Sequence, residues 1–273
     1  MPRRFGTQNF PPWTAAAAPA GLNVGDTYYN TTDRLLYVWD IDATGSTYAW
    51  RAMPRGVLNG WYVSPFGAQL NYASTTSLTV VGSDVRSITP AGTPIYWYQV
   101  AFGYSYGYVT SSTYASSNTT LNVIAYSGAI QTNTIPEWGV ALGGAPPDFP
   151  ASFPWTPTFT GFASQPSSIA DQFFVVNGWC CYAARTLTGG TSNATTFTFN
   201  LPFTAKTVTS GQWQAAISCD DNSAVVTVGG SMRATTASAT CVVQKDWDNA
   251  NPNKWTTTGT KRVTAGTLWY PIR

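Results

Sequence analysis

Residues 195–201 read Thr-Thr-Phe-Thr-Phe-Asn-Leu, and this short stretch decides the fold class of the region around it. Apolar and polar side chains alternate, so that Phe197, Phe199 and Leu201 share one face of an extended chain. Alternation with a period of two residues is typical of a β-strand that buries one face. The stretch therefore predicts a strand in a sheet that packs against a core.

Further β-rich segments lie on both sides of this stretch, throughout residues 155–273. Eight or nine of them follow at the spacing of a β-sandwich, so we expect a jelly-roll-like β-sandwich. Upstream, residues 144–156 hold four prolines, which predicts a stiff linker and a domain boundary. The expected strands are residues 158–162, 172–185, 195–201, 212–218, 224–228, 232–234, 240–244, 256–263 and 268–272.

The composition of the whole 273-residue chain favours an all-β protein. Charged residues make up only 10%, against roughly 25% in a typical soluble domain. Aromatic residues reach 15%, and Thr, Val, Tyr and Trp are abundant, which favours half-buried strands over helices. A monomer so poor in charge exposes much uncharged surface, and symmetric association is the usual way to cover it. We therefore expect an oligomer.

Several classes of function are disfavoured by composition. The chain has no histidine and one glutamate, Glu137, which removes His-based triads and His metal ligands. We expect no enzymatic activity, no cofactor and no metal. The net charge of +2 comes without a basic cluster, so no nucleic-acid partner is expected. No apolar run approaches the ~18–20 residues that span a bilayer, and residues 1–21 lack the apolar core of a signal peptide.

The four cysteines are interpreted as buried free thiols. Cys180 and Cys181 are adjacent, so in a strand they point to opposite faces and could not both ligate one metal without a bulge. Cys219 and Cys241 complete the set, which is small for a disulfide-stapled secreted protein of this length. Assembly in a reducing cytoplasm fits this pattern.

The N-terminal region divides into an arm and a small β unit within residues 1–62. Residues 1–21 carry prolines that forbid regular structure, together with three apolar anchors, Phe5, Phe10 and Trp13. Such an arm is stabilised only by docking, either on a larger assembly or on the protein's own body. Residues 22–53 predict a three-stranded β-meander with a turn at 30–33.

This β unit resembles a repeat found near the N-termini of tail-fibre and minor tail proteins of tailed bacteriophages. The resemblance rests on GDTYYNTTD at residues 25–33, LYVWD at 36–40 and Ala-Trp at 49–50. The family pattern is roughly GDxYYNTTxxxLYVYDG…W. This chain departs from it at residues 41–47, where the family usually has a short glycine turn. In the family the repeat is a structural module without catalysis.

Two further regions resemble modules of the same family. Residues 63–146, expected to form a middle antiparallel β-domain, carry LTVVG at 78–82 and YGYVTSSTY at 106–114, followed by TTLNV at 119–123. Residues 147–273 comprise the linker and the sandwich. Within them, the run from Trp155 to Phe159, through residues 197–206, to Trp269 and Tyr270 resembles the C-terminal sandwich of many tail fibres.

The resemblance implies a virion-surface protein that is made and assembled in the bacterial host cytoplasm. It implies a homotrimer, attachment by the N-terminal arm to a tail, baseplate or major capsid protein, and a C-terminal tip that binds host-surface glycan. A trimeric capsid-decoration or head-fibre protein is the alternative, because no long coiled-coil or β-helical shaft is predicted. A polysaccharide depolymerase is disfavoured by the missing histidine, the single glutamate and the absence of a β-helix repeat.

The most polar loop, residues 245–255, is the candidate ligand site. Tryptophan faces stack on the C–H faces of sugars, and carboxylate and amide groups take their hydroxyls. A solvated turn is the simpler interpretation, and calcium binding through the two aspartates is a third. The candidate glycan-binding residues are Asp246, Trp247, Asp248, Asn249 and Trp255.

Two other sets of residues are assigned structural roles. Asp220 and Asp221 follow Cys219 at the end of a strand, and a hydrated turn is favoured over an acid–base pair. Trp179 and Trp213 lie within predicted strands, and we interpret both as core residues rather than ligand platforms.

Overall fold

The structure is a computed structural model that describes residues 27–30, 35–41, 48–52, 60–141, 144–166, 171–187, 189–209, 211–222, 224–225, 229–245 and 255–273. Within these residues the chain folds into antiparallel sheets, and its helical content is one 3-10 turn, η1 (Pro65–Gly67). The all-β prediction is therefore confirmed. The predicted anchors Phe5, Phe10 and Trp13 lie outside the described residues.

The described N-terminal strands form a three-stranded antiparallel sheet in the order β1-β2-β3, which is the order of a meander. Tyr29 pairs with Leu36, and Trp39 pairs with Trp50. Of the residues that carry the virion-fibre resemblance, residues 27–30, 36–40 and 49–50 therefore fall on paired strands. These strands are β1 (Thr27–Asn30), β2 (Leu35–Ile41) and β3 (Tyr48–Ala52).

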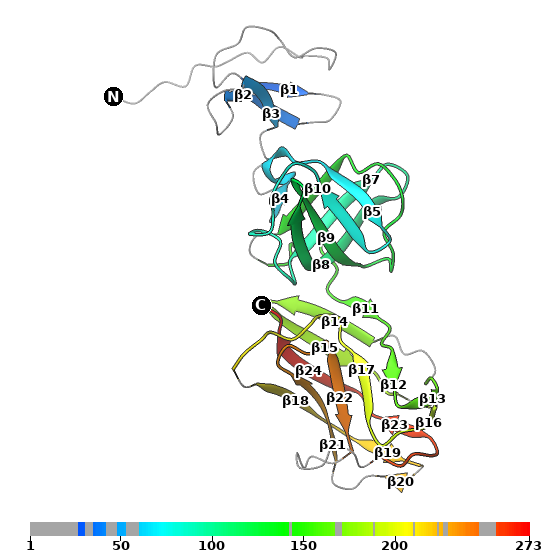
Figure 1. The fold of residues 1–273 in the computed structure, drawn as a ribbon. Coiled ribbons are helices and arrows are strands. Elements are labelled where there is room, and N and C mark those ends of the chain that lie inside the picture. Colours follow the sequence, from blue (N-terminus) through cyan, green and yellow to red (C-terminus); the bar gives the residue numbers. More distant parts are fainter. Residues whose placement is uncertain are drawn as a thin grey trace.

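The middle unit is a seven-stranded antiparallel sheet in the order β4-β10-β7-β8-β9-β6-β5 (Figure 1). The sheet curls around one core, because alternate residues of its strands, such as Leu78, Trp97 and Leu121, are fully buried on the inner face. The strands are β4 (Trp61–Val63), β5 (Leu70–Ser74), β6 (Ser77–Val80), β7 (Pro94–Gln99), β8 (Gly103–Ala115), β9 (Asn118–Ala125) and β10 (Glu137–Ala141).

The C-terminal unit contains two larger antiparallel sheets that share a core. Rings from the two sheets meet between them, and the centroids of Tyr182 and Phe199 lie 5.4 Å apart. One sheet has the order β11-β14-β15-β24 and the other the order β12-β17-β22-β21-β18. Their strands are β11 (Phe153–Trp155), β14 (Asp171–Val176), β15 (Trp179–Ala184), β24 (Gly266–Pro271), β12 (Phe159–Thr160), β17 (Phe197–Asn200), β22 (Thr240–Gln244), β21 (Gly230–Thr235) and β18 (Gln212–Ile217).

Two smaller sheets extend this unit. One pairs β13 (Phe162–Ser164) with β16 (Thr191–Ser192), and the other has the order β20 (Ala224–Val225), β19 (Cys219–Asp221), β23 (Lys261–Val263). The alternation at residues 195–201 is confirmed, because Phe197, Phe199 and Leu201 are all buried. All four cysteines are buried and free, as expected.

The segment expected as one strand at 172–185 is a hairpin of β14 and β15. Its turn consists of Asn177 and Gly178, whose φ angles of 50° and 79° place both residues in the left-handed region. An Asn-Gly pair of this kind is the preferred two-residue connection of a hairpin. Trp179 therefore begins a strand on the outer surface and is 41% exposed, so the interpretation of Trp179 as a core residue was wrong. Trp213 is partly buried and packs against the core.

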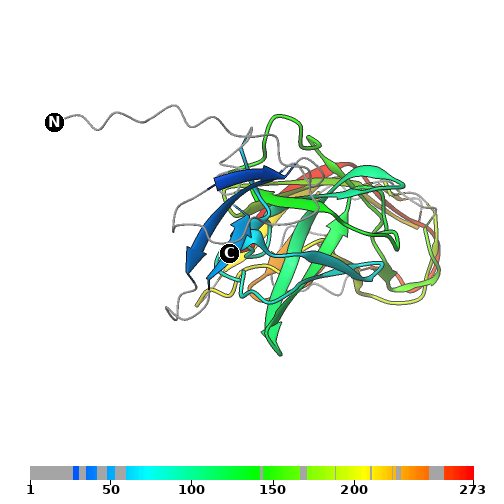
Figure 2. The same cartoon turned by 90° about the horizontal axis from the view of Figure 1, so that it is seen from above.

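The middle and C-terminal units are stacked end to end, and they overlap when viewed along that axis (Figures 1 and 2). The proline-rich segment is part of the packed seam between them. Phe149 and Phe153 are buried, with ring centroids 4.9 and 4.7 Å from that of Tyr108. The backbone N–H of Val175 donates to the hydroxyl of Tyr108 at 3.2 Å. Since each aromatic pair adds about 0.5–1.5 kcal/mol beyond burial, these contacts hold the two units together.

Candidate functional site

Four residues of the predicted glycan site, Asp246, Trp247, Asp248 and Asn249, lie outside the described residues. Trp255 is described and is 2% exposed. Its indole N–H donates to the backbone oxygen of Val243 at 2.9 Å, and its ring packs on Phe197. Trp255 therefore offers no open face to a sugar, and its predicted stacking role does not hold.

A stronger candidate lies on the outer face of the seven-stranded sheet. We call it the aromatic groove, and it has a cavity volume of about 300 Å³. Strands β4, β7, β8 and β10 supply all but one of its lining residues, and the proline-rich segment supplies the last, Asp148. The lining residues are Trp61, Val63, Tyr96, Tyr104, Tyr106, Glu137 and Asp148.

The floor of the groove is built from rings that are locked by hydrogen bonds to the two carboxylates. Trp61 and Tyr96 pack edge to face, with centroids 4.8 Å apart. The indole N–H of Trp61 donates to Asp148 Oδ1 at 2.9 Å, and the hydroxyl of Tyr96 donates to Glu137 Oε1 at 3.0 Å. Each carboxylate is thus anchored at one oxygen, and its position is fixed relative to the rings.

The rim of the groove is open to solvent. Tyr104 is 58% exposed and Asp148 is exposed. Burial, with the nearby charge of Asp148, raises the pKa of Tyr106, so its hydroxyl stays protonated at neutral pH and can donate a hydrogen bond. Ring faces beside carboxylate acceptors and a phenol donor are the groups that recognise the apolar and hydroxylated faces of a sugar.

Sequence reasoning missed this groove because its residues come from distant parts of the chain. Glu137 stood out as the single glutamate, but nothing local joins it to Trp61 or Asp148. The pairing of β10 with both β4 and β7 brings these strands together. That pairing has no signature in a single sequence.

Asp221 is not the hydrated turn residue that the sequence predicts. It is 4% exposed and forms ion pairs with Lys245 and with Lys261, which is itself 1% exposed. Thr256 adds a hydroxyl donor at 2.7 Å and a backbone N–H at 3.1 Å. Burial alone raises the pKa of Asp221, but these hydrogen bonds outweigh it and lower the pKa from 3.8 to about 2. Asp221 is therefore a structural anchor that is ionised at neutral pH, and it is a poor acid–base catalyst.

Asp220, its neighbour, does lie nearer to solvent. One of its carboxylate oxygens forms an ion pair with the Arg262 guanidinium at 3.4 Å, and the Arg262 side chain is more than half exposed. Adjacent strand residues point to opposite faces, which explains why the two aspartates differ so much.

Comparisons with protein-family models, with curated proteins and with solved structures returned no match. Within the described part of the chain, no helix has the length and apolar character needed to cross a membrane. The same described residues contain no cluster of three or more Cys, Asp or Glu side chains placed to hold a metal ion.

Proposed function

We propose that this chain is a structural protein of a tailed-bacteriophage virion, tail-fibre-like or a minor tail protein, that adheres to host-surface glycan without catalysis. The family resemblance of residues 25–50, 78–123 and the C-terminal unit supports the virion assignment. In this proposal the arm with Phe5, Phe10 and Trp13 attaches the protein to the virion. In the same proposal the C-terminal unit is a jelly-roll-like β-sandwich, and it faces outward on the virion surface.

The aromatic groove is the observation that carries the adhesive part of the proposal. Tyr104 presents an exposed ring beside two anchored carboxylates, in a cavity large enough for one or two sugar rings. Binding of glycan rather than cleavage fits these carboxylates, because each already accepts a hydrogen bond from a buried ring.

A homotrimer is part of the proposal, and the outer face of β14, β15 and β24 supports it. Val176, Trp179 and Trp269 are 43%, 41% and 44% exposed on this face. At the outward positions of these three described strands there is no charged residue. A neutral face with two half-exposed tryptophans is well suited to burial against copies of the same chain. A monomeric mass by light scattering would contradict this.

Glycan binding by the purified protein tests the groove directly. We expect binding to isolated host-surface polysaccharide, and we expect Tyr104→Ala to weaken it at least tenfold, because the exposed ring is lost. Tyr114→Ala is the matched control, since Tyr114 is also an exposed tyrosine of β8 but does not line the groove. Equal affinity of the Tyr104→Ala variant and the native protein would reject the groove as the site.

Cryo-electron microscopy of the intact virion tests the assignment to a virion part. Density for the two stacked units at the tail tip, with the C-terminal unit outward, would support adhesion. Density repeated over the capsid lattice would instead favour the capsid-decoration alternative. Absence of the chain from purified virions would reject both.

A further inference from the structure

A second cavity lies in the seam between the middle and C-terminal units, and it shares no lining residue with the aromatic groove. We call it the interunit cleft, and its volume is about 290 Å³. The connection from β6 to β7 and the end of β10 form one wall, and the end of β14, its turn and the last residue form the other. The lining residues that bear on binding are Ile88, Thr93, Pro94, Val175, Asn177 and Arg273.

The walls of the cleft are fixed by close packing across the seam. A Cβ added to Gly92, whose φ is +81°, would lie 2.5 Å from Cδ1 of Ile272. The segments around Gly92 and Ile272 can therefore pack this closely only because residue 92 is glycine. The hydrogen bond from the Val175 N–H to the Tyr108 hydroxyl closes the same seam. The cleft is therefore formed before any ligand enters it.

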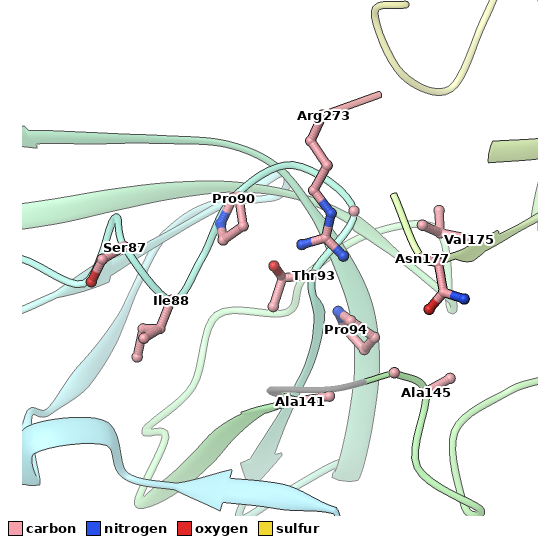
Figure 3. A pocket seen from close by; sticks show the side chains of 12 residues that line it. Ser87, Ile88, Pro90, Thr93, Pro94, Ala141, Ala145, Val175, Asn177 and Arg273 are labelled. Carbon is pink, nitrogen blue, oxygen red and sulfur yellow. The ribbon is translucent and has the colours of Figure 1, made fainter. Parts of the chain in front are cut away.

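The position of Arg273 is also set by packing. The backbone N–H of Ile272 donates to the carbonyl of Gly178 at 2.9 Å, which holds the end of the chain beside the β14–β15 turn. A Cβ on Gly178 would lie 2.9 Å from Cγ of Arg273, so the side-chain stem lies directly against that turn. Figure 3 shows the guanidinium extending into the cleft between Thr93 and Asn177.

Arg273 is the one charged residue among those that line the cleft. No Asp or Glu side chain lines the cleft beside it, so the guanidinium favours a ligand with a single negative charge. A guanidinium is a planar fork that binds a carboxylate through two parallel hydrogen bonds. The hydroxyl of Thr93 and the amide of Asn177 flank the fork, where they can pair with ligand hydroxyls.

Apolar side chains supply another part of the lining, and the size of the cleft matches one ring. Ile88, Pro94 and Val175 supply aliphatic walls, and the volume lies at the lower end of small-molecule sites. We propose that the interunit cleft binds a monosaccharide unit that carries a carboxylate, of the uronic-acid type, with Arg273 on the carboxylate. This proposal goes beyond adhesion through the aromatic groove and does not require the groove to bind anything.

Calorimetric titration at low salt tests the proposal, with glucuronate as probe and glucose as its uncharged match. We expect glucuronate to bind with a dissociation constant on the order of 1 mM, the scale of a single small ligand, and glucose at least tenfold more weakly. Arg273→Gln should weaken the binding of glucuronate at least tenfold and leave the affinity for glucose unchanged. Arg262→Gln, which removes another exposed arginine from the same unit, should change neither affinity.

Amide chemical shifts supply a second readout that does not depend on one variant. Glucuronate should perturb the amides of Thr93, Asn177 and Arg273, and leave those of the aromatic groove unmoved. Equal affinities for glucuronate and glucose, or unchanged binding by Arg273→Gln, would overturn the proposal. If acetate competes as strongly as glucuronate, the sugar class is wrong and the cleft is a simple anion site. Loss of groove binding in Tyr104→Ala with intact glucuronate binding would separate the two sites.

Discussion

Replacing Asp221 by alanine is expected to destabilise the C-terminal unit by about 3 kcal/mol at neutral pH. The carboxylate is buried and pairs with Lys245 and Lys261, and Lys261 is itself almost completely buried. Breaking a buried ion pair by removing one partner costs about 3–5 kcal/mol, because the remaining charge is left uncompensated. Lys261 keeps hydrogen bonds to the Thr256 hydroxyl and to the carbonyl of Thr258, at 2.7 and 3.1 Å, which places the expected cost at the lower end.

The pKa of Asp221 gives an independent measure of how much the carboxylate stabilises the fold, and it predicts how this stabilisation depends on pH. The folded pKa is lowered from 3.8 to about 2, so the ionised carboxylate stabilises the fold above pH 3.8, and this stabilisation is lost as pH falls through about 2. The difference between the unfolded and folded pKa values corresponds to about 2 kcal/mol of unfolding free energy, at roughly 1.4 kcal/mol for each pKa unit. The gap in stability between the native protein and Asp221→Ala should therefore narrow by about 2 kcal/mol between pH 5 and pH 2.

Urea unfolding followed by tryptophan fluorescence measures both effects. Trp255 is a suitable reporter, because its ring lies 5.9 Å from the Lys261 ammonium. Asp220→Ala is the matched control, expected to change stability by less than about 0.5 kcal/mol, since its ion pair with Arg262 is exposed and long.

A double variant separates the charge effect from simple loss of contacts. Asp221→Ala combined with Lys261→Met removes the stranded charge, so it should be more stable than Asp221→Ala alone by at least about 1 kcal/mol. If the single variant costs less than 1 kcal/mol, or if the double variant is the less stable of the two, the network does not anchor this unit as argued.

Three further outcomes are expected. Tyr108→Phe should cost about 1 kcal/mol in unfolding free energy, because the seam hydrogen bond from Val175 is lost, and a change below 0.3 kcal/mol would show that the bond adds nothing. Gly92→Val should lower the melting temperature by several degrees, since it combines a left-handed backbone with a clash on Ile272; an unchanged melting curve would contradict the packing described. Burial raises the pKa of Cys180 to about 12, so Ellman's reagent should label this thiol only after denaturation, and rapid labelling of the folded protein would refute its burial.

The sequence predicts those features of the fold that depend on neighbours along the chain. Alternation at residues 195–201 identifies the buried face of β17, because a period of two residues leaves no other way to hide Phe197 and Phe199. The hairpin turn at Asn177 and Gly178 carried a recognisable local signal, yet the strand expected at 172–185 ran straight through it. If residues 177–178 are interpreted as a turn, Trp179 is predicted to begin the next strand.

The features that escaped prediction depend on strand pairing between distant segments. Asp221 is buried because it pairs in register with Lys261, forty residues away in β23. Its neighbour Asp220 has the same chemistry and faces the other way, so composition could not distinguish them. Trp255 shows the opposite error. Its polar loop predicts an indole that is open to a ligand, but the indole lies in the core and donates a hydrogen bond to β22.

The proline-rich segment connects both candidate sites to the hydrophobic seam. Gly144 and Ala145 line the interunit cleft, Asp148 lines the aromatic groove, and Phe149 between them and β11 packs on Tyr108. Pro146, Pro147 and Pro150 restrict the backbone between and after these residues, so the segment is stiff in isolation as well as packed. A flexible spacer would let the two units move apart, and the cleft would then have only one wall. The same rigidity holds the groove and the cleft at constant separation, so if both bind sugar as proposed, the two weak sites together would engage one glycan more tightly than either does alone.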